Sequence, residues 1–279
     1  MADSTKLEVA LPSFERPPVN EVVLSVAFER PKTLSIAHLG NFWSSTLSKD
    51  YPETEEVAPY QPQIENMGAF AYPQISMQLL DRPPSPRIWA KSTDGQTLVQ
   101  LQSDWFAVNW RRQDRPEIEY PHWEFVESNF TSEFRKFRDY VDHANLGEVT
   151  LRQCEVTYIN QIQPGDIWQD HSQLDRVFSF ENFVGLSSIG TPVSSNFGLI
   201  YLLRDSEIDV GRLYVNMQPA FQSDTRQPIV LLTLIARGMP LSQSEDGILS
   251  FFRVGHEAIV RSFAGLTTEP MHREWGRER

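Results

Sequence analysis

Cysteine is nearly absent from this sequence: Cys154 is the only one among 279 residues. A single cysteine cannot form an internal disulfide, which excludes a disulfide-stapled secreted module and fits a reducing compartment. Long apolar runs are also missing, since none approaches the ~20 residues that a membrane-spanning helix needs. Residues 1–6 lack the basic and apolar regions of a signal peptide. We therefore expect a cytoplasmic protein that does not associate with membranes.

Glycine-based motifs are missing as well. The 14 glycines form neither Gly-x-x-x-x-Gly-Lys nor Gly-x-Gly-x-x-Gly, the common nucleotide cradles, and there is no Gly-x-Ser-x-Gly nucleophile elbow. No two of the six histidines stand four residues apart, and Asp170, His171 and Asp175 in a polar loop are the nearest approach to a metal-ligand cluster. We expect no cofactor and no metal, and the sequence carries no catalytic signature, so an enzymatic role stays open but disfavoured.

Positive charge is in deficit. Lysine and arginine number 25 against 37 acidic residues, which gives a net charge of −12. Proteins that bind duplex nucleic acid gain most of their affinity from phosphate neutralisation and show basic surfaces. A nucleic-acid role is therefore disfavoured, whereas an acidic surface suits solubility and a basic protein partner.

The apolar content of 40% and aromatic content of 11% are sufficient for a large buried core. Alternation of apolar residues, helical spacing and turn residues predict the elements, and Asp94-Gly95 between two alternating runs predicts a hairpin. The predicted strands are residues 21–29, 51–60 at an edge, 87–92, 96–102, 105–111, 148–163, 196–204, 211–221 and 228–237. The predicted helices are residues 34–47, a helix that follows Tyr120-Pro121 with apolar residues through Val141, and a closing helix from Ser244 that ends at Gly265.

This order predicts an α+β protein in which antiparallel meander sheets carry amphipathic helices on one face. Residues 1–20 are interpreted as an N-terminal arm, 21–163 as a first α+β half and 164–279 as a second half of one compact unit. Each half ends as a meander followed by a helix. Two pseudo-repeated halves of this kind occur in helix-grip folds and in the TATA-binding-protein-like saddle, an analogy of fold that implies no function.

Four short motifs, taken in order, carry a resemblance. They are Pro17–Val23, Phe106–Arg111 followed by Tyr120-Pro121, Tyr158–Asn160, and Phe263–Thr268 followed by Trp275-Gly276. Together they resemble a sporadically distributed bacterial family of uncharacterised proteins of similar length. The resemblance implies a bacterial protein of patchy distribution, as expected for accessory genes, and it supplies no catalytic residue.

Polar and aromatic residues alternate with apolar ones along three of the predicted strands. Because side chains alternate across a sheet, we expect these residues to converge on one concave polar surface, and arginine with tyrosine and asparagine is typical of ligand or partner recognition. The alternative is the solvated outer face that antiparallel sheets commonly have. The candidate binding residues are Asn109, Arg111, Tyr158, Asn160, Arg212, Tyr214 and Asn216.

Cys154 and His256 could each carry chemistry outside this set of residues. Cys154 lies in mid-strand beside Glu155, which favours a small buried residue over a reactive thiolate. His256 lies one position off the apolar stripe of the last helix, where a packed or solvated histidine is commoner than a general base, although its ordinary pKa would allow proton transfer.

Two functions follow as hypotheses. The first is a non-catalytic binding protein of the bacterial cytoplasm, an accessory or defence-operon component that binds a protein partner or small ligand on its sheet face. The second is a ligand-binding or hydrolytic enzyme with a cavity between the sheet and the long helices. Its working groups would be Arg111, Arg212, Tyr158, Asn160 and His256, which acid–base chemistry requires within hydrogen-bond reach of one another.

Overall fold

A computed structural model describes residues 10–68, 86–113, 115, 117–179, 193–205 and 207–278. Its nine strands form one antiparallel sheet in the order β2-β3-β4-β5-β1-β6-β9-β8-β7. The predicted α+β class with an antiparallel sheet is confirmed.

The strands are β1 (Val19–Glu29), β2 (Glu53–Val57), β3 (Arg87–Lys91), β4 (Thr97–Gln102), β5 (Trp105–Arg111), β6 (Thr150–Ile162), β7 (Phe197–Asp205), β8 (Ile208–Phe221) and β9 (Pro228–Gly238). The α-helices are α1 (Ile36–Phe42), α2 (His122–His143), α3 (Glu245–Leu266) and α4 (Glu269–Glu274). Helix α1 continues into a π-helical turn (Trp43–Leu47), and a 3₁₀ helix (His171–Arg176) lies between β6 and β7.

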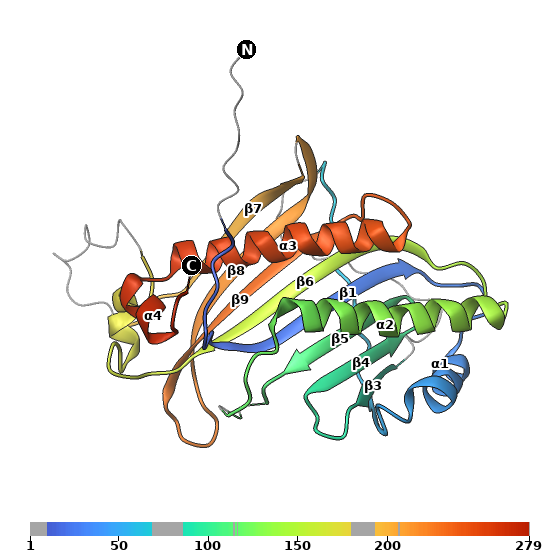
Figure 1. Cartoon of the computed structure of the whole chain (residues 1–279), viewed down its shortest axis with the longest axis horizontal. Coiled ribbons are helices and arrows are strands. Elements are labelled where there is room, and N and C mark those ends of the chain that lie inside the picture. The colour runs from blue at the N-terminus through green and yellow to red at the C-terminus, as the bar shows by residue number, and fades with distance from the viewer. Residues whose placement is uncertain are drawn as a thin grey trace, which may run out of the picture.

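Helices α2 and α3 lie side by side on one face of the sheet, which we call the helix face (Figure 1). The predicted apolar stripe of α2 is buried there, and Phe137 packs against Phe106 of β5 with 5.4 Å between the ring centroids. Phe130 meets Phe252 of α3 edge-on at 4.9 Å, which joins the two helices. One apolar core therefore fills the space between the helices and this face.

The opposite face of the sheet is polar, and we call it the polar face. Residues 58–68, here named the strap, lie against it, with the Tyr60 ring 4.7 Å from that of Trp105. Residues 61–86 are rich in proline and carry few periodic signals, so their sequence predicts an irregular course with a short helix or strand near residues 75–80. The described part, 61–68, contains no helix or strand, and residues 75–80 lie outside the described residues.

The two ends of the described chain are tied together. Phe14 forms an isolated bridge with Arg277, Glu15 N–H donates to the Gly276 carbonyl at 3.0 Å, and Glu278 N–H donates to that of Ser13 at 3.0 Å. We call this pairing of residues 13–16 with 275–278 the clasp. It holds the arm that precedes β1 across the C-terminal half of α3 (Figure 1).

Two helix boundaries differ from the prediction. The first helix begins after Ser35, whose backbone N–H donates to Nδ1 of His38 at 3.2 Å. The last predicted helix does not end at Gly265: α3 runs on to Leu266, and α4 then follows a break at Thr267. Gly265 lies within α3, and no atom lies within 4 Å of the position that its Cβ would take. The presence of a glycine there is therefore not what ends the helix.

Among the described residues, no helix has the length and apolar character to cross a membrane.

Candidate functional site

A cavity of about 350 Å³ lies on the helix face where four segments meet: the arm before β1, the start of α2, β6 and the second half of α3. Its apolar wall includes Phe14, Val19, Trp123, Ile259, Val260 and Phe263. Its polar lining includes Tyr120, His122, Glu124, Tyr158, Asn160 and His256. A concave, mostly apolar site with a few convergent polar groups is the usual form of a small-molecule pocket.

A hydrogen-bonded relay lies at one end of this cavity. The hydroxyls of Tyr120 and Tyr158 are 2.9 Å apart, and the Tyr158 hydroxyl is 3.0 Å from Nδ1 of His256. The His256 ring stacks on Trp123, with centroids 4.2 Å apart and planes 10° from parallel. The relay therefore joins the segment just before α2 to β6 and α3, and the stack on Trp123 of α2 fixes the plane of the imidazole.

The direction of the relay sets what His256 offers a ligand. If Tyr120 donates to Tyr158 and Tyr158 to Nδ1, the neutral imidazole carries its proton on Nε2 and is a donor there. In the reverse direction Nδ1–H donates to Tyr158, and Nε2 becomes an acceptor. The same three residues can thus complement either a donor or an acceptor.

Burial keeps every member of the relay uncharged near neutral pH. It lowers the pKa of His256 from 6.5 to about 4, because the imidazolium would lose its hydration. It raises the pKa of both Tyr120 and Tyr158 above the ordinary tyrosine value of 10, so both hydroxyls stay protonated. The described lining contains Glu124 but no lysine or arginine, so the cavity favours uncharged groups over anions.

A glycine brings His256 to Tyr158. A Cβ atom at Gly255 would lie 2.9 Å from the Ala236 Cβ and 3.2 Å from a Val156 methyl, so only glycine lets α3 approach the sheet this closely here. Alternation along β6 directs Tyr158 toward the same helix. The close packing of α3 thus places the next residue, His256, within hydrogen-bond distance of the strand.

One residue that lines the cavity has a strained backbone. His122 has a φ of 65°, a left-handed value that residues other than glycine rarely adopt. It follows Pro121, at the start of α2, and its ring lies 5.7 Å from that of Tyr120. Such conformations are held by their surroundings and cluster at functional sites.

The seven predicted binding residues do not share one surface. Tyr158 and Asn160 are buried on the helix face at the cavity, where Asn160 donates to the Leu232 carbonyl at 3.0 Å. The other five lie on the polar face: Asn109, Arg111, Arg212, Tyr214 and Asn216. The expectation of one concave surface was wrong. Side chains alternate between the two faces of each strand, but this alternation does not say which of the two sets faces the helices.

Most of the five polar-face residues are engaged by the protein itself. Arg212 and the Tyr214 hydroxyl both donate to Glu65 of the strap, at 2.5 Å each. Asn109 accepts from Gln100 at 2.7 Å and donates to Glu21 at 2.5 Å. The Arg111 guanidinium lies 5.7 Å from the Trp89 ring centroid, and Asn216 is exposed.

The constellation predicted for an enzyme is therefore not assembled. Tyr158, Asn160 and His256 meet at the cavity, while Arg111 and Arg212 lie on the other side of the sheet. The residues that sequence reasoning missed are Phe14, His122 and Trp123, together with the role of Tyr120 as more than a helix start. Their contribution depends on contacts between segments far apart in the chain, and the only local signal was Tyr120-Pro121.

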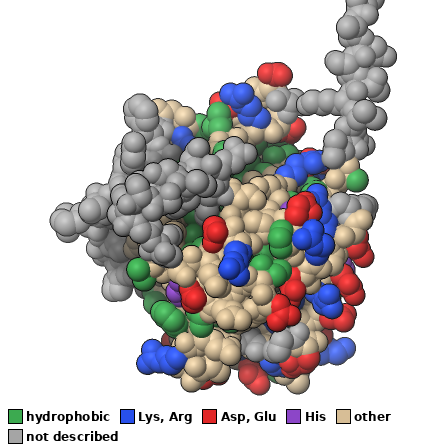
Figure 2. All heavy atoms as spheres, turned by 90° about the vertical axis from the view of Figure 1, so that its left-hand side faces the viewer, with side chains coloured by type: hydrophobic (Ala, Val, Ile, Leu, Met, Phe, Trp, Pro, Cys, Tyr) green, Lys and Arg blue, Asp and Glu red, His purple; other side chains and the backbone are tan. Residues whose placement is uncertain are grey.

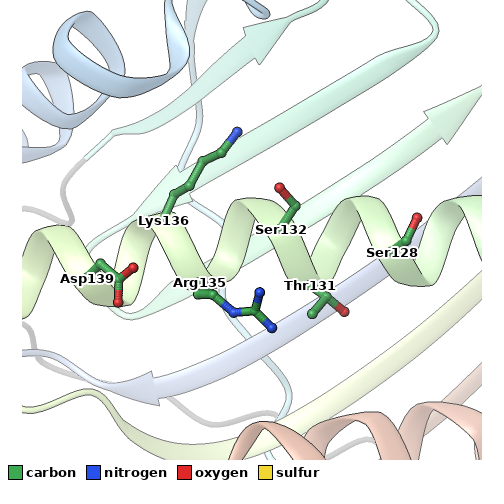
Figure 3. Close-up of a pocket in the computed structure, with 6 residues that line it drawn as sticks. All are labelled: Ser128, Thr131, Ser132, Arg135, Lys136 and Asp139. Atoms are coloured by element: carbon green, nitrogen blue, oxygen red, sulfur yellow. The ribbon is translucent and has the colours of Figure 1, made fainter.

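A second depression, of about 340 Å³, follows the solvent side of α2 (Figure 3). All six residues that line it come from that single helix, so no opposing wall closes it. Arg135 is paired with Glu245 at 2.7 Å, and Lys136 with Glu133 at 2.8 Å. Its cations are already neutralised, and it offers no convergent site.

Cys154 and the polar loop around His171 have structural roles. Cys154 is fully buried, and burial raises the pKa of its thiol, so it remains protonated. Asp170 accepts from the Ser172 N–H at 2.8 Å and caps the 3₁₀ helix, while the His171 ring bonds the Ile229 carbonyl. In the described part of the chain, no three histidine, cysteine or acidic side chains gather as metal ligands do.

The end of the molecule that carries α4 shows acidic and basic side chains side by side (Figure 2). Ion pairs in this region include Arg277 with Glu269 at 3.3 Å. A surface of mixed sign lacks the continuous positive stripe by which nucleic acid is held.

Comparisons with protein-family models, with curated proteins and with solved structures gave no match. The resemblance to a sporadically distributed bacterial family therefore remains a prediction. Its four motifs nonetheless meet in space, since each contributes to the cavity or the clasp: Pro17 and Val19, Tyr120, Tyr158 and Asn160, and Phe263 with Trp275 and Gly276.

Proposed function

We propose that this protein is a non-catalytic binding protein that takes a small uncharged molecule into the cavity between α2 and α3. The observation that carries the proposal is the neutral relay of Tyr120, Tyr158 and His256 at one end of an apolar and aromatic cavity. Such a site buries the body of a ligand against its wall and orients it by a few polar groups.

The lining indicates the class of ligand. Trp123 and Phe263 offer ring surfaces, and Ile259 and Val260 offer aliphatic ones. His256 presents one donor or acceptor without a charge. We therefore expect an aromatic or heterocyclic molecule with a hydroxyl, amide or ring nitrogen, and Glu124 at the lining disfavours an anion.

A hydrolytic role has weaker support. A general base works best when its pKa lies near the working pH, whereas the pKa of His256 is lowered to about 4. Neither Arg111 nor Arg212 belongs to the lining, and its described residues include no lysine or arginine that could stabilise a developing oxyanion. His256 therefore fits a hydrogen-bonding role better than proton abstraction.

The test begins with a set of small hydroxy- and amide-bearing aromatic compounds, screened by ligand-observed NMR against the purified full chain. We predict that Tyr158→Phe, which removes one hydroxyl from the relay, weakens binding of the hits by about 3- to 10-fold, as expected for one hydrogen bond. Tyr51→Phe is the matched control, because Tyr51 is equally buried and bonds Asn129 away from the cavity. Val260→Trp fills the cavity and should abolish binding; unchanged affinity in that variant would refute the proposal.

We further propose that the sheet is built from two related halves. The support is the strand order: outward from the centre it reads β1-β5-β4-β3 on one side and β6-β9-β8-β7 on the other. The last strand of each run in sequence, β5 or β9, leads into a long helix, α2 or α3. On this proposal the halves are residues 19–143 and 150–266, so β6 belongs to the second half and the boundary lies before it rather than at 163.

We also propose a bacterial cytoplasmic setting and a place among accessory or defence genes, which the single cysteine and the motif resemblance support. A tagged copy expressed in its native host tests this setting. Fractionation with cytoplasmic markers is the expected result.

A further inference from the structure

The strap crosses the polar face of the sheet from one half to the other. Tyr60 lies at β4 and β5, where it contacts Gln102 and Trp105. Five residues further along the chain, Glu65 lies at β8, where Arg212 and Tyr214 donate to it. Between them β1, β6 and β9 pass beneath the strap, so it runs across the strands rather than along them.

Two glutamines of the sheet bind the backbone of the strap. The Gln102 side chain accepts from Tyr60 N–H and donates to the Tyr60 carbonyl, both at 2.8 Å. The Gln153 side chain accepts from Glu65 N–H at 2.7 Å and donates to the Gln63 carbonyl at 2.8 Å. Each glutamine amide thus provides one acceptor and one donor to the strap backbone, as a neighbouring strand would. The polar face can therefore recognise an extended backbone whatever side chains that backbone carries.

Two niches then select side chains. The first holds the Tyr60 ring against Trp105, at 4.7 Å, with the Arg87 guanidinium 5.8 Å from the Tyr60 centroid and 5.6 Å from that of Trp105. A planar cation and an indole form a site for an aromatic ring.

The second niche holds a carboxylate. Arg212 and the Tyr214 hydroxyl donate to Glu65, and Arg237 lies 4.0 Å from it while also paired with Glu155. The side chain of Glu65 is only 6% exposed. Among the described residues, Arg212 and Arg237 lie at this niche with Glu155, and the Glu65 carboxylate reaches them from outside the sheet.

Apart from Tyr60, the strap is held by polar contacts. Ile64 is 39% exposed, and Gln63 is exposed except for its bonds to Arg237 and Gln153. Release of the strap would expose the small apolar cluster of Ala27, Trp105 and Ala107 that the Tyr60 ring covers. The other contacts named here are polar, and water would replace them. Backbone pairing combined with side-chain niches is the way extended peptides bind to other proteins.

We propose that the polar face is a groove for an extended peptide that carries a tyrosine and, five residues later, a glutamate, and that the strap is its resident occupant. A partner protein with an exposed segment of this pattern takes the place of the strap. The groove lies across the sheet from the cavity, so this proposal stands or falls independently of the proposed ligand.

The probe is a fluorescent synthetic peptide with the sequence of residues 58–68, measured by anisotropy against the full chain. In wild type the strap competes, so binding is weak. The double variant Tyr60→Ala/Glu65→Ala vacates both niches, and we expect it to bind the peptide at least tenfold more tightly than wild type. Ile64→Ala is the matched control, because this exposed strap residue fills no niche, and it should bind like wild type.

Two changes test specificity. Replacing the peptide's glutamate by glutamine should weaken binding to the double variant by about tenfold, and adding Arg212→Ala to that variant should weaken it similarly. The proposal would be overturned if the double variant bound both peptides equally. It would also be overturned if a double variant that still unfolds cooperatively bound the peptide no more tightly than wild type does. A double variant that forms a dimer by exchanging chains would also overturn it, since the groove would then belong to a second copy.

Wild type provides a measurement that does not depend on the variants. The N–H groups of Tyr60 and Glu65 are bonded to the two glutamines, so hydrogen exchange at these positions should accelerate when excess unlabelled peptide displaces the strap. Unchanged exchange at saturating peptide contradicts the proposal.

Discussion

His256 illustrates how the setting of one side chain decides what it can do. In sequence it is a histidine one position off an apolar stripe, with nothing to distinguish it from a solvated residue. In the structure it is stacked on Trp123 and bonded to Tyr158, and burial lowers its pKa to about 4. The residue is therefore a neutral hydrogen-bonding group at pH 7.

That burial makes stability depend on pH. The folded pKa of His256 lies below the unfolded value of 6.5, so between these values the unfolded chain binds more protons than the folded one. The contribution is fully present above pH 6.5 and is lost as pH falls toward 4. A shift of this size corresponds to about 3 kcal/mol at most.

We predict that His256→Phe, which keeps a ring against Trp123 but cannot titrate, flattens the decline in the free energy of unfolding between pH 6.5 and 4.5. Urea denaturation at several pH values measures this. His272, whose pKa burial also lowers, titrates in both proteins and cancels in the comparison. Parallel declines in wild type and variant would show that His256 does not titrate on unfolding.

At the residue scale, sequence reasoning reached part of the site. Tyr158 and Asn160 were identified from strand alternation, and both line the cavity. Arg212 and Tyr214 were identified the same way but belong to the other face. Alternation divides the side chains of each strand into two sets, one on each face of the sheet. Only the packing of α3 on β6 and β9 decides which set is buried beneath the helix.

At the element scale, α3 depends on a close approach to the sheet. Gly255 lets the helix pack against Val156 of β6 and Ala236 of β9. In the same helix, Gly265 has no atom within 4 Å of its Cβ position. Replacement by alanine should therefore have opposite effects on stability at the two glycines.

We predict that Gly255→Ala destabilises the protein by about 1–3 kcal/mol, because the added methyl overpacks the interface between helix and sheet. Gly265→Ala should instead stabilise it by up to ~1 kcal/mol through helix propensity. Chemical denaturation of both variants measures the difference. A similar change in both would mean that the close approach at Gly255 carries no energetic weight.

Elements with a strong local signal were the ones predicted well. The hairpin at Asp94-Gly95 forms, with Gly95 at a φ of 70°, and the apolar stripe of α2 is buried as its spacing indicated. The π-helical turn after α1 and the short helix α4 were missed. The π-helical turn is followed by a bond from the Trp43 ring N–H to the Tyr51 carbonyl, and Trp275, just after α4, packs on Phe14 from the other end of the chain. Neither contact belongs to the apolar spacing from which helices were predicted.

At the scale of the whole molecule, the two edges of the sheet differ in character. Edge strand β2 is Glu-Thr-Glu-Glu-Val, with its first four residues exposed. Edge strand β7 is apolar, with Ile200, Tyr201 and Leu202 each about half exposed. Charge on an edge strand opposes pairing with another chain, and an apolar edge promotes it.

We predict that β7 is the edge through which the protein aggregates. Ile200→Lys should slow the growth of light scattering at high concentration, whereas Glu56→Val on β2 should accelerate it by removing a protecting charge. An Ile200→Lys variant that aggregates as fast as wild type would exclude β7 as the route.

The fold class followed from the order of elements, but the arrangement of the sheet did not. The pairing of β1 with β6 joins residues more than a hundred positions apart, for example Leu24 with Val156. No local pattern encodes that register, and it is this register that brings Tyr158 beside the start of α2.

Because of the clasp, one wall of the cavity can be held in place only after the last part of the described chain has been synthesised. Ser13 and Glu278, bonded through their side chains and backbones, are 265 residues apart. The arm that walls the cavity emerges from the ribosome early, yet the residues that hold it in place emerge only after α3 and α4. A nascent chain that has already formed its sheet would still leave the cavity open on one side until residues 275–278 have been synthesised and have paired with residues 13–16.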